Sequence, residues 1–297
     1  MTHRLSDFEG LNGLRVIADG EFAVTGKLST PLEGLCVPLR SAKYAGEVNA
    51  NPRISAVVTT REIANSLDSR IAIAVADDPD AAHSEIHAKL ALAHAEELRK
   101  TPNSIDRSAV IDPSARIADH AVSIGAGAWI GPNVHIAPGV TVSNHCVLHS
   151  GVALGVPGFN TGRIGGRLRI VPQLGGVFLS PYVELLANCC VARAIFGGAT
   201  TLGEETVADN LVYIAHDVQI GRAVQVCALA NILGRTVIGD NAYIGPSAVV
   251  KNGLTLGDGA RVSMGAVVTQ DVPAGATVSG NFAVPHDRFL DHIRSIR

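Results

Sequence analysis

The stretch LGEETVADNLVYIAHDVQIGRAVQVCALANILGRTVIGDNAYIGPSAVVKNGLTLGDGARVSMGAVV, residues 202–268, decides the fold. An aliphatic or small apolar residue stands at every sixth position of this stretch, without a gap. Same-face residues recur about every 3.6 positions in a helix and about every 2 in a half-buried strand, so neither element explains the spacing. A six-residue repeat predicts a parallel β-helix, in which three hexads close one triangular coil. The positions are Leu202, Ala208, Ile214, Ile220, Val226, Ile232, Ile238, Ile244, Val250, Leu256, Val262 and Val268.

Earlier hexads extend the solenoid towards the N-terminus. They begin at Ile105, slip by one residue after Ile117, and continue from Ile124 to Leu154. The register fails over residues 156–172, a segment that contains three arginines. A β-helix has few places to build a pocket, so function is expected where the chain leaves the coil.

The rest of the chain predicts a second domain and a terminal helix. Residues 54–59 and 71–75 have the composition of buried strands, and residues 80–100 have helical apolar spacing, which together indicate a small α/β domain. The C-terminal residues have a basic, amphipathic helical pattern, and we expect them to cap the open coil. The fold class is therefore mainly β. The expected domains are an α/β nucleotide-sugar-binding domain over 1–102, a β-helix domain over 103–284 and a C-terminal helix over 285–297.

Composition excludes several classes of function. The net charge of −3 and the absence of a basic patch argue against a nucleic-acid partner. No run approaches the roughly 18 apolar residues of a membrane span, and the N-terminus lacks the pattern of a secretory signal, so we expect a cytoplasmic protein. Five cysteines without a CxxC pair favour neither a disulfide framework nor a zinc knuckle.

His216 is the strongest candidate for chemistry. It lies two positions after the inward Ile214, so it should point outward near a corner of the coil. Asp209 and Asn210 lie seven and six residues upstream, and Asp217 adjoins it. A carboxylate held against one imidazole nitrogen fixes the tautomer and makes the other nitrogen a better base. An outward histidine on a solenoid is also often merely solvated, so this pattern alone leaves both readings open.

Four segments resemble one family in the same order along the chain. DNLVYIAHDVQIG, residues 209–221, resembles the DNLVQIAHNVxIG signature of the bacterial lipid A N-acyltransferases, the UDP-3-O-acylglucosamine N-acyltransferases. SAKYAGEVNANPRISAVVT resembles the family's NPKY segment and the strand that follows it. HSGVALGVPGFN and RIVPQLGGV resemble its HSG…GFG and KIPQ stretches.

The resemblance implies a homotrimer of left-handed β-helices with active sites between subunits and no metal. It implies transfer of an acyl group from a 4'-phosphopantetheine thioester, on acyl carrier protein or CoA, to the amine of a nucleotide-linked amino sugar. No permanently bound cofactor is implied. His216 matches the family's general base, Asp209 its orienting carboxylate, and Gly234 the glycine whose N–H stabilises the oxyanion. The candidate substrate-binding residues are Tyr44, Asn210, Gln173 and Arg193.

The sequence departs from the family pattern at positions that are expected to recognise the substrate. Gly253 stands where the family has a second histidine, so that side chain's role does not carry over. Tyr44 matches one aromatic of the uracil site, but Pro38 replaces the other and Ser41 replaces an asparagine. Losing one aromatic face weakens a base sandwich. We therefore expect the same reaction on an altered acceptor, in lipopolysaccharide, O-antigen or other surface-glycan biosynthesis, with lipid A acylation proper as the alternative.

Two other classes of function stay open at this point. A zinc enzyme of the carbonic-anhydrase type needs three histidines that converge between subunits. His145 and His149 are four residues apart, and outward side chains at this spacing in a six-residue repeat should point in different directions. A non-catalytic scaffold is the plainest alternative. The arginines of the excursion could clamp a pyrophosphate or an acidic carrier surface, or simply be solvated; they are Arg163, Arg167 and Arg169.

Overall fold

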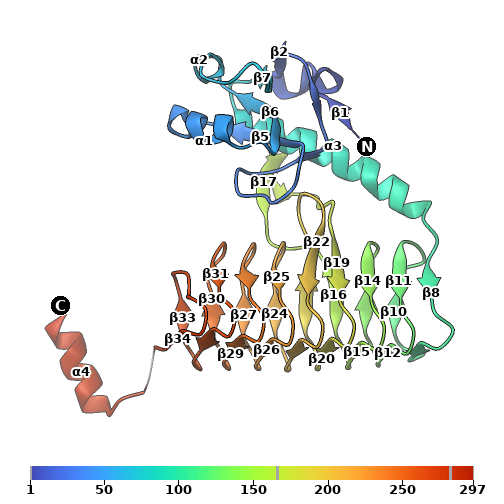
Figure 1. Cartoon of the computed structure of the whole chain (residues 1–297), viewed down its shortest axis with the longest axis vertical. Helices are drawn as coiled ribbons and strands as arrows, with labels where there is room; N and C mark the ends of the chain where they lie inside the picture. The colour runs from blue at the N-terminus through green and yellow to red at the C-terminus, as the bar shows by residue number, and fades with distance from the viewer. Residues whose placement is uncertain (1, 165–166, 281–282, 297) are drawn as a thin grey trace.

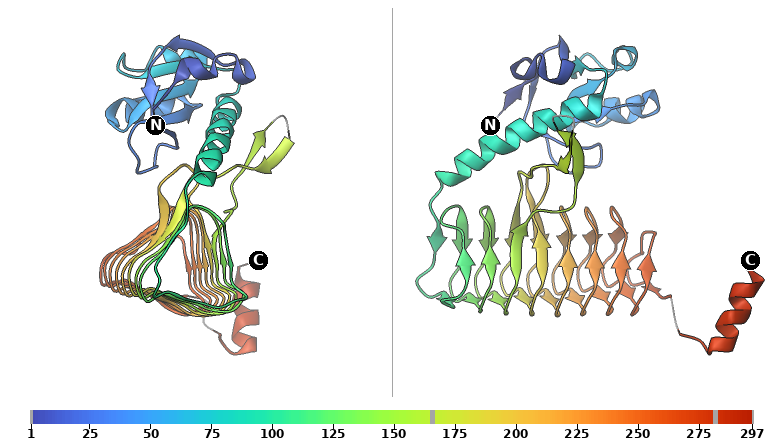
Figure 2. Two further views of the ribbon diagram at one scale, coloured as in Figure 1. Left: turned by 90° about the vertical axis from the view of Figure 1, so that its right-hand side faces the viewer. Right: turned by 180° about the vertical axis from the view of Figure 1, so that it is seen from behind.

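The computed structural model describes residues 2–164, 167–280 and 283–296. A β-helix forms the long body, and an α/β domain stands over one edge of it (Figure 1). Three parallel sheets make the faces of a triangular prism, which is clearest in the end-on view of Figure 2. The predicted fold class, a hexapeptide β-helix with an N-terminal α/β domain and a short C-terminal helix, is confirmed.

The hexapeptide register places one aliphatic residue of each hexad inside the prism. Ile214 pairs with Ile232 in the next coil, and Ile232 pairs with Val250, so 232 − 214 = 18 residues separate equivalent positions. All three are fully buried in one continuous core. Many corners turn through a residue with left-handed φ, as at Asp217 (φ 60°) and Arg235 (φ 62°).

The strands of the prism are short, and equivalent strands stack in order along its axis. The first sheet contains β8 (Ser104–Ile105), β11 (Val122–Ile124), β14 (Val140–Val142), β19 (Gly176–Leu179), β22 (Ala199–Leu202), β25 (Gln219–Ile220), β28 (Val237–Ile238) and β31 (Thr255–Leu256). The second contains β9 (Val110–Ile111), β12 (Trp129–Ile130), β15 (Val147–Leu148), β20 (Glu184–Leu185), β23 (Val207–Ala208), β26 (Gln225–Val226), β29 (Tyr243–Ile244), β32 (Arg261–Val262) and β34 (Thr277–Val278). The third contains β10 (Arg116–Ile117), β13 (His135–Ile136), β16 (Ala153–Val156), β21 (Cys190–Ala192), β24 (Tyr213–Ile214), β27 (Asn231–Ile232), β30 (Val249–Val250) and β33 (Val267–Val268).

The chain leaves the coil twice, both times at the corner between the third and first sheets. The first excursion, between β16 and β19, contains the antiparallel hairpin of β17 (Thr161–Ile164) and β18 (Arg167–Ile170). The second, on the next coil, runs from β21 to β22 and buries Ile195 and Phe196. These excursions lie directly before the coil that carries His216, so the irregular part of the solenoid surrounds the candidate base.

The N-terminal domain contains a five-stranded sheet, ordered β2-β7-β6-β5-β4, and its helix α3 (Pro79–Arg99) packs against strand β17 of the hairpin. Helix α3 begins at Pro79 because the Asp78 carboxylate caps the Ala81 N–H at 3.2 Å. Ile86 and Leu90 of α3 pack into the core of the domain. The other elements are β1 (His3–Arg4), η1 (Leu5–Phe8), η2 (Leu11–Gly13), β2 (Arg15–Ala18), β3 (Glu21–Phe22), β4 (Val24–Thr25), β5 (Leu35–Leu39), η3 (Ala42–Tyr44), α1 (Ala45–Ala50), β6 (Ile54–Thr59), α2 (Arg61–Ala64) and β7 (Ala72–Val75).

Helix α4 (His286–Ser295) forms as the sequence predicts, but it does not cap the coil. Figures 1 and 2 show it standing apart from the last strands of the prism. The expectation that it covers the open end is therefore wrong in this structure. Amphipathic spacing predicts the helix, and it does not determine which surface the apolar face meets.

Candidate active site

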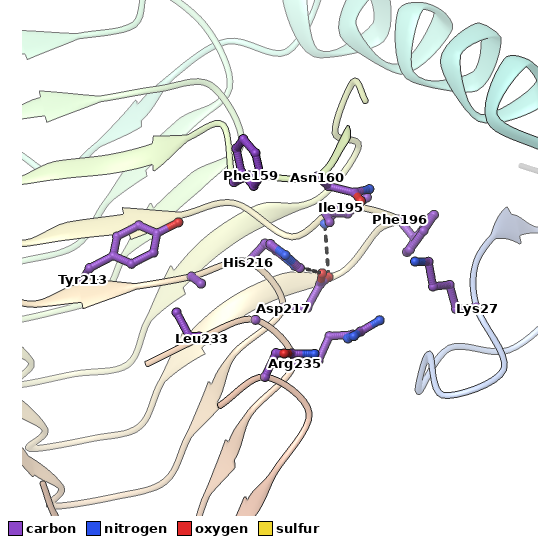
Figure 3. A pocket seen from close by; sticks show the side chains of 13 residues that line it. Lys27, Phe159, Asn160, Ile195, Phe196, Tyr213, His216, Asp217, Leu233 and Arg235 are labelled. Carbon is purple, nitrogen blue, oxygen red and sulfur yellow. Dashed lines mark hydrogen bonds and ion pairs between the residues drawn. The ribbon is translucent and has the colours of Figure 1, made fainter. Parts of the chain in front are cut away.

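The corner between the third and first sheets brings the candidate residues together. His216 follows Ile214 of β24 by two positions, and Gly234 follows Ile232 of β27 in the same way one coil later. Counting from the buried Ile214 correctly predicts that His216 points out of the core. Its side chain is 17% exposed and enters a cavity (Figure 3).

A carboxylate orients the His216 imidazole. Nδ1 of His216 lies 2.8 Å from Oδ2 of Asp217. The other carboxylate oxygen, Oδ1, accepts the Ile195 N–H at 3.1 Å, and the Asp217 N–H donates to the Thr200 hydroxyl at 2.9 Å. Asp217 is thus held from both its backbone and its side chain.

This hydrogen-bond pattern determines the tautomer of the neutral imidazole. An ionised carboxylate only accepts hydrogen bonds, so Nδ1 of His216 must carry the proton that Asp217 accepts. Nε2 then presents a free lone pair, and no described group occupies it. A neutral imidazole in this state accepts a proton from a reacting group, as a general base does.

Two glycines lie close to the His216 side chain. A Cβ at Gly234 would stand 2.4 Å from Cε1 and 2.7 Å from Nε2 of His216. A Cβ at Gly158, in the first excursion, would stand 2.9 Å from Cβ and 3.1 Å from Cδ2 of the same residue. Among the described residues, no acceptor is bonded to the Gly234 N–H. The ring therefore sits in a slot that larger residues would close, beside a free backbone donor.

The cavity in front of His216 has a volume of about 380 Å³ and is lined by residues from six segments of the chain. The N-terminal domain contributes Lys27, and the two excursions contribute aromatic and polar side chains. The remaining walls are successive corners of the coil. The lining residues are Lys27, Phe159, Asn160, Ile195, Phe196, Tyr213, Ala215, His216, Asp217, Leu233, Gly234, Arg235 and Asn252.

A second cavity of about 410 Å³ continues the cleft towards the N-terminal domain. Both cavities are lined by Lys27 and Phe196, so they adjoin. His83 and His87 of α3 form part of its wall. Burial lowers the pKa of His83 to about 3 and that of His87 to about 4, so both rings are neutral at physiological pH. Pro38 also lines this second cavity.

Asp209 is not the carboxylate that contacts His216 within the chain. Its Oδ1 accepts the backbone and side-chain N–H groups of Asn210, each at 2.7 Å, and its Oδ2 accepts the Ala228 N–H at 3.2 Å. Asn210 in turn accepts the Ala187 N–H at 3.1 Å. Both residues stabilise a different corner, between the second and third sheets, and within this chain the carboxylate bonded to His216 is that of Asp217.

Three further candidates, Gln173, Arg193 and Tyr44, line neither of the two cavities. Gln173 bonds both backbone groups of Gly158, at 2.9 and 2.7 Å, and so holds the loop that packs on His216. Arg193 is mostly buried, which lowers its pKa, and donates to the Pro138 carbonyl. Tyr44 is 44% exposed and lines neither cavity.

Two arginines of the excursion, Arg167 and Arg169, lie outside the His216 cavity. Arg167 and Arg169 are exposed on β18, and the side chain of Arg163 lies outside the described residues. Within the described part of this single chain, no three histidine, cysteine or acidic side chains come together in a way that could hold a metal ion. None of the described helices is long and apolar enough to cross a membrane.

Sequence reasoning missed Lys27 and Gly158 and gave Asp217 too little weight. The sequence contains a signal for Asp217, because it adjoins His216 at a position where the resembling family has asparagine. Lys27 carries no local signal, since only the docking of the N-terminal domain brings it to the cavity.

Comparison with known proteins shows which proteins this chain resembles in sequence. The family described as bacterial transferase hexapeptide (six repeats) matches residues 121–155 and 235–270. A UDP-3-O-acylglucosamine N-acyltransferase of Caulobacter sp. (strain K31) is 42% identical over 151 residues, which cover 50% of this chain and 44% of that protein. The protein of the same name from Herminiimonas arsenicoxydans is 28% identical over 308 residues, covering 92% and 86%.

The coverage of these relatives is uneven. The chain matches 41–44% of the length of the Caulobacter protein and of two Methylobacterium proteins with the same name. Among solved structures, the Arabidopsis UDP-N-acetylglucosamine acyltransferase is 21% identical with a TM-score of 0.47, over 60% of this chain and 69% of that one.

Proposed function

We propose, from its relation to the UDP-3-O-acylglucosamine N-acyltransferases at 28–42% identity, that this hexapeptide-repeat protein is an N-acyltransferase. The acyl group would move from a 4'-phosphopantetheine thioester, carried by acyl carrier protein or CoA, to the amine of a nucleotide-linked amino sugar. The observation that carries the proposal is the His216–Asp217 pair, whose free Nε2 faces a cavity beside the Gly234 N–H.

The proposed step follows from this geometry. The amine nitrogen attacks the thioester carbonyl, a C–N bond forms, and Nε2 of His216 takes one proton from that nitrogen. The carbonyl oxygen gains negative charge and is stabilised by the free Gly234 N–H. The tetrahedral intermediate then collapses, the C–S bond breaks, and the leaving thiolate takes the proton from the imidazolium. The products are an amide and a free thiol.

In this proposal the protein binds an acceptor other than the lipid A precursor. Tyr44 lies outside both cavities, and Pro38 lines the second cavity where the resembling family has an aromatic residue. A base held without that aromatic sandwich needs other contacts, so we place the substrate among nucleotide-linked amino sugars of surface-glycan synthesis. Acylation of UDP-3-O-acylglucosamine is the alternative. A homotrimer in the cytoplasm completes the proposal, and sedimentation velocity tests the trimer.

The test is a mass-spectrometric survey of acylation. Purified protein is incubated with UDP-, GDP- and dTDP-linked amino sugars and with UDP-3-O-acylglucosamine, against acetyl-CoA and 3-hydroxyacyl carrier protein. The proposal predicts one acceptor whose mass rises by one acyl group, with one free thiol released per turnover. Acylation of the lipid A precursor at the highest rate would replace the proposed acceptor with the alternative.

Replacement of His216 decides the catalytic assignment. His216→Ala should abolish this acylation because the amine loses its base. His149→Ala is the matched control, because His149 also bonds a carboxylate, Glu184 at 2.9 Å, but lines neither cavity. Undiminished acylation by His216→Ala, or an equal loss in His149→Ala, would contradict the role of His216.

A further inference from the structure

Two cationic side chains line the His216 cavity without an acidic partner. Within the described part of the chain, neither Nζ of Lys27 nor the guanidinium of Arg235 forms an ion pair. Arg40, in the adjoining cavity, differs because it pairs with Asp80 at 2.9 Å. Asp217 is the one nearby carboxylate among the lining residues, and both of its oxygens already accept hydrogen bonds.

The cavity is divided by His216 into two chemically different parts. In Figure 3, Tyr213 and Leu233 lie on one side of His216, and Lys27 and Arg235 lie on the other. The first part is largely apolar and suits carbon-rich groups. The second carries two positive charges beside the base, and unpaired cations in a partly enclosed site attract an anion.

Hydrogen bonds fix the backbone at both cationic residues. The Arg235 N–H donates to the His216 carbonyl at 2.9 Å, so the backbone of this arginine is fixed relative to that of the base. The Lys27 turn is closed in both directions: the Lys27 N–H donates to the Thr30 hydroxyl at 3.0 Å, and the Thr30 N–H donates to the Lys27 carbonyl at 2.9 Å. The loop is also tied to α3, where Thr25 and His87 lie 2.6 Å apart.

We propose that Lys27 and Arg235 form a subsite for a phosphoryl group of a substrate. Guanidinium presents a fork of donors that fits two phosphate oxygens, and an ammonium adds a point charge. Binding there would hold the substrate at a fixed distance from Nε2 of His216. The inference rests on the proposed function for its place in the reaction. The phosphoryl group belongs either to the diphosphate of a nucleotide-linked acceptor or to a phosphate of the CoA or phosphopantetheine donor.

Binding without turnover tests this subsite. Isothermal titration calorimetry would measure the Kd of UDP, dTDP, GDP and CoA for the full chain and for Lys27→Gln, Arg235→Gln and the double variant. Lys43→Gln and Arg222→Gln are matched controls, because both cations lie outside the two cavities. Each cavity variant should weaken the ligand that uses the subsite roughly 10- to 100-fold, the range expected for a lost charge-assisted hydrogen bond. The loss should shrink as salt rises.

The ligands affected identify the source of the phosphoryl group. Weakening confined to the nucleotides assigns the subsite to the acceptor, and weakening confined to CoA assigns it to the donor. Unchanged Kd values for every ligand, or an equal effect of Lys43→Gln, would overturn the proposal. If ligand binding depends on Lys27 and Arg235 but no acceptor is acylated, only the proposed function is refuted. Acylation with an unchanged KM in the double variant would refute only the subsite.

Discussion

Replacement of Gly234 by alanine tests the slot around the base. The φ of Gly234 lies outside the left-handed region, so an alanine fits the backbone, but its Cβ would stand 2.4 Å from Cε1 of His216. Ordinary contact begins at 3.4 Å, so the overlap is 3.4 − 2.4 = 1.0 Å. The ring must move by about this distance, which strains its 2.8 Å bond to Asp217.

A displacement of this size has a large kinetic effect. A misplacement of about 1 Å in a reacting group lowers the rate roughly 10²-fold. The ring borders a cavity and can shift into it. The stability cost should therefore be near the lower end of the roughly 1–3 kcal/mol typical of overpacking. We therefore expect Gly234→Ala to lower kcat about 100-fold and the free energy of unfolding by about 1 kcal/mol. Steady-state acylation kinetics and urea unfolding measure the two effects.

Gly127 supplies a matched control. A Cβ there would lie 2.5 Å from Nδ1 of His145, so the substitution causes a similar collision with an imidazole. Neither Gly127 nor His145 lines the His216 cavity. Gly127 also has φ +65°, so alanine adds roughly 1–2 kcal/mol of backbone strain. Gly127→Ala should therefore lose at least as much stability as Gly234→Ala and keep its kcat. A folded Gly234→Ala protein with kcat within threefold of the wild type would refute the reasoning.

Other substitutions and conditions test the surrounding contacts. In Asp217→Asn, the amide oxygen should stay on the Ile195 N–H and the amide N–H₂ should face Nδ1 of His216, which moves the imidazole proton to Nε2 and lowers kcat by roughly 10²- to 10⁴-fold. Asp209→Asn should leave kcat nearly unchanged. A larger loss of kcat in Asp209→Asn than in Asp217→Asn would assign the orienting role to Asp209. Burial lowers the pKa of His87 from 6.5 to about 4, so the unfolded chain binds more protons in this range. The contribution of this group to the free energy of unfolding is complete above pH 6.5 and should fall by ~3 kcal/mol towards pH 4. Urea unfolding across this pH range measures the fall, which should be smaller in His87→Gln. An equal pH dependence in both proteins would count against the buried neutral ring.

The solenoid was predictable because its pattern is redundant. From Leu202 to Val268 each hexad repeats the same inward position, and pairing at 18-residue intervals, as between Ile214 and Ile232, buries all of these positions. That register also places His216 outside the core. Local periodicity and a fixed coil length thus determine both the fold and the direction of the candidate base.

The partners of His216 were less predictable for a physical reason. Neighbouring residues do not usually face one another, and the left-handed φ of 60° at Asp217 turns its carboxylate back onto the preceding ring. Lys27 reaches the cavity through the docking of one domain on another, which no local sequence pattern encodes. Gly158 depends on a loop held by Gln173, so its contact with His216 follows from tertiary structure alone.

The position of a bound acceptor relative to His216 tests the central claim most directly. A crystal structure of the full chain with the nucleotide-linked amino sugar that it acylates, in the absence of the acyl donor, would show the acceptor before reaction. The account predicts that the sugar's amine nitrogen lies within about 3.2 Å of Nε2 of His216, or one water away, on the side of the Gly234 N–H. An amine bound outside this cavity, with Nε2 facing another group, would contradict the account.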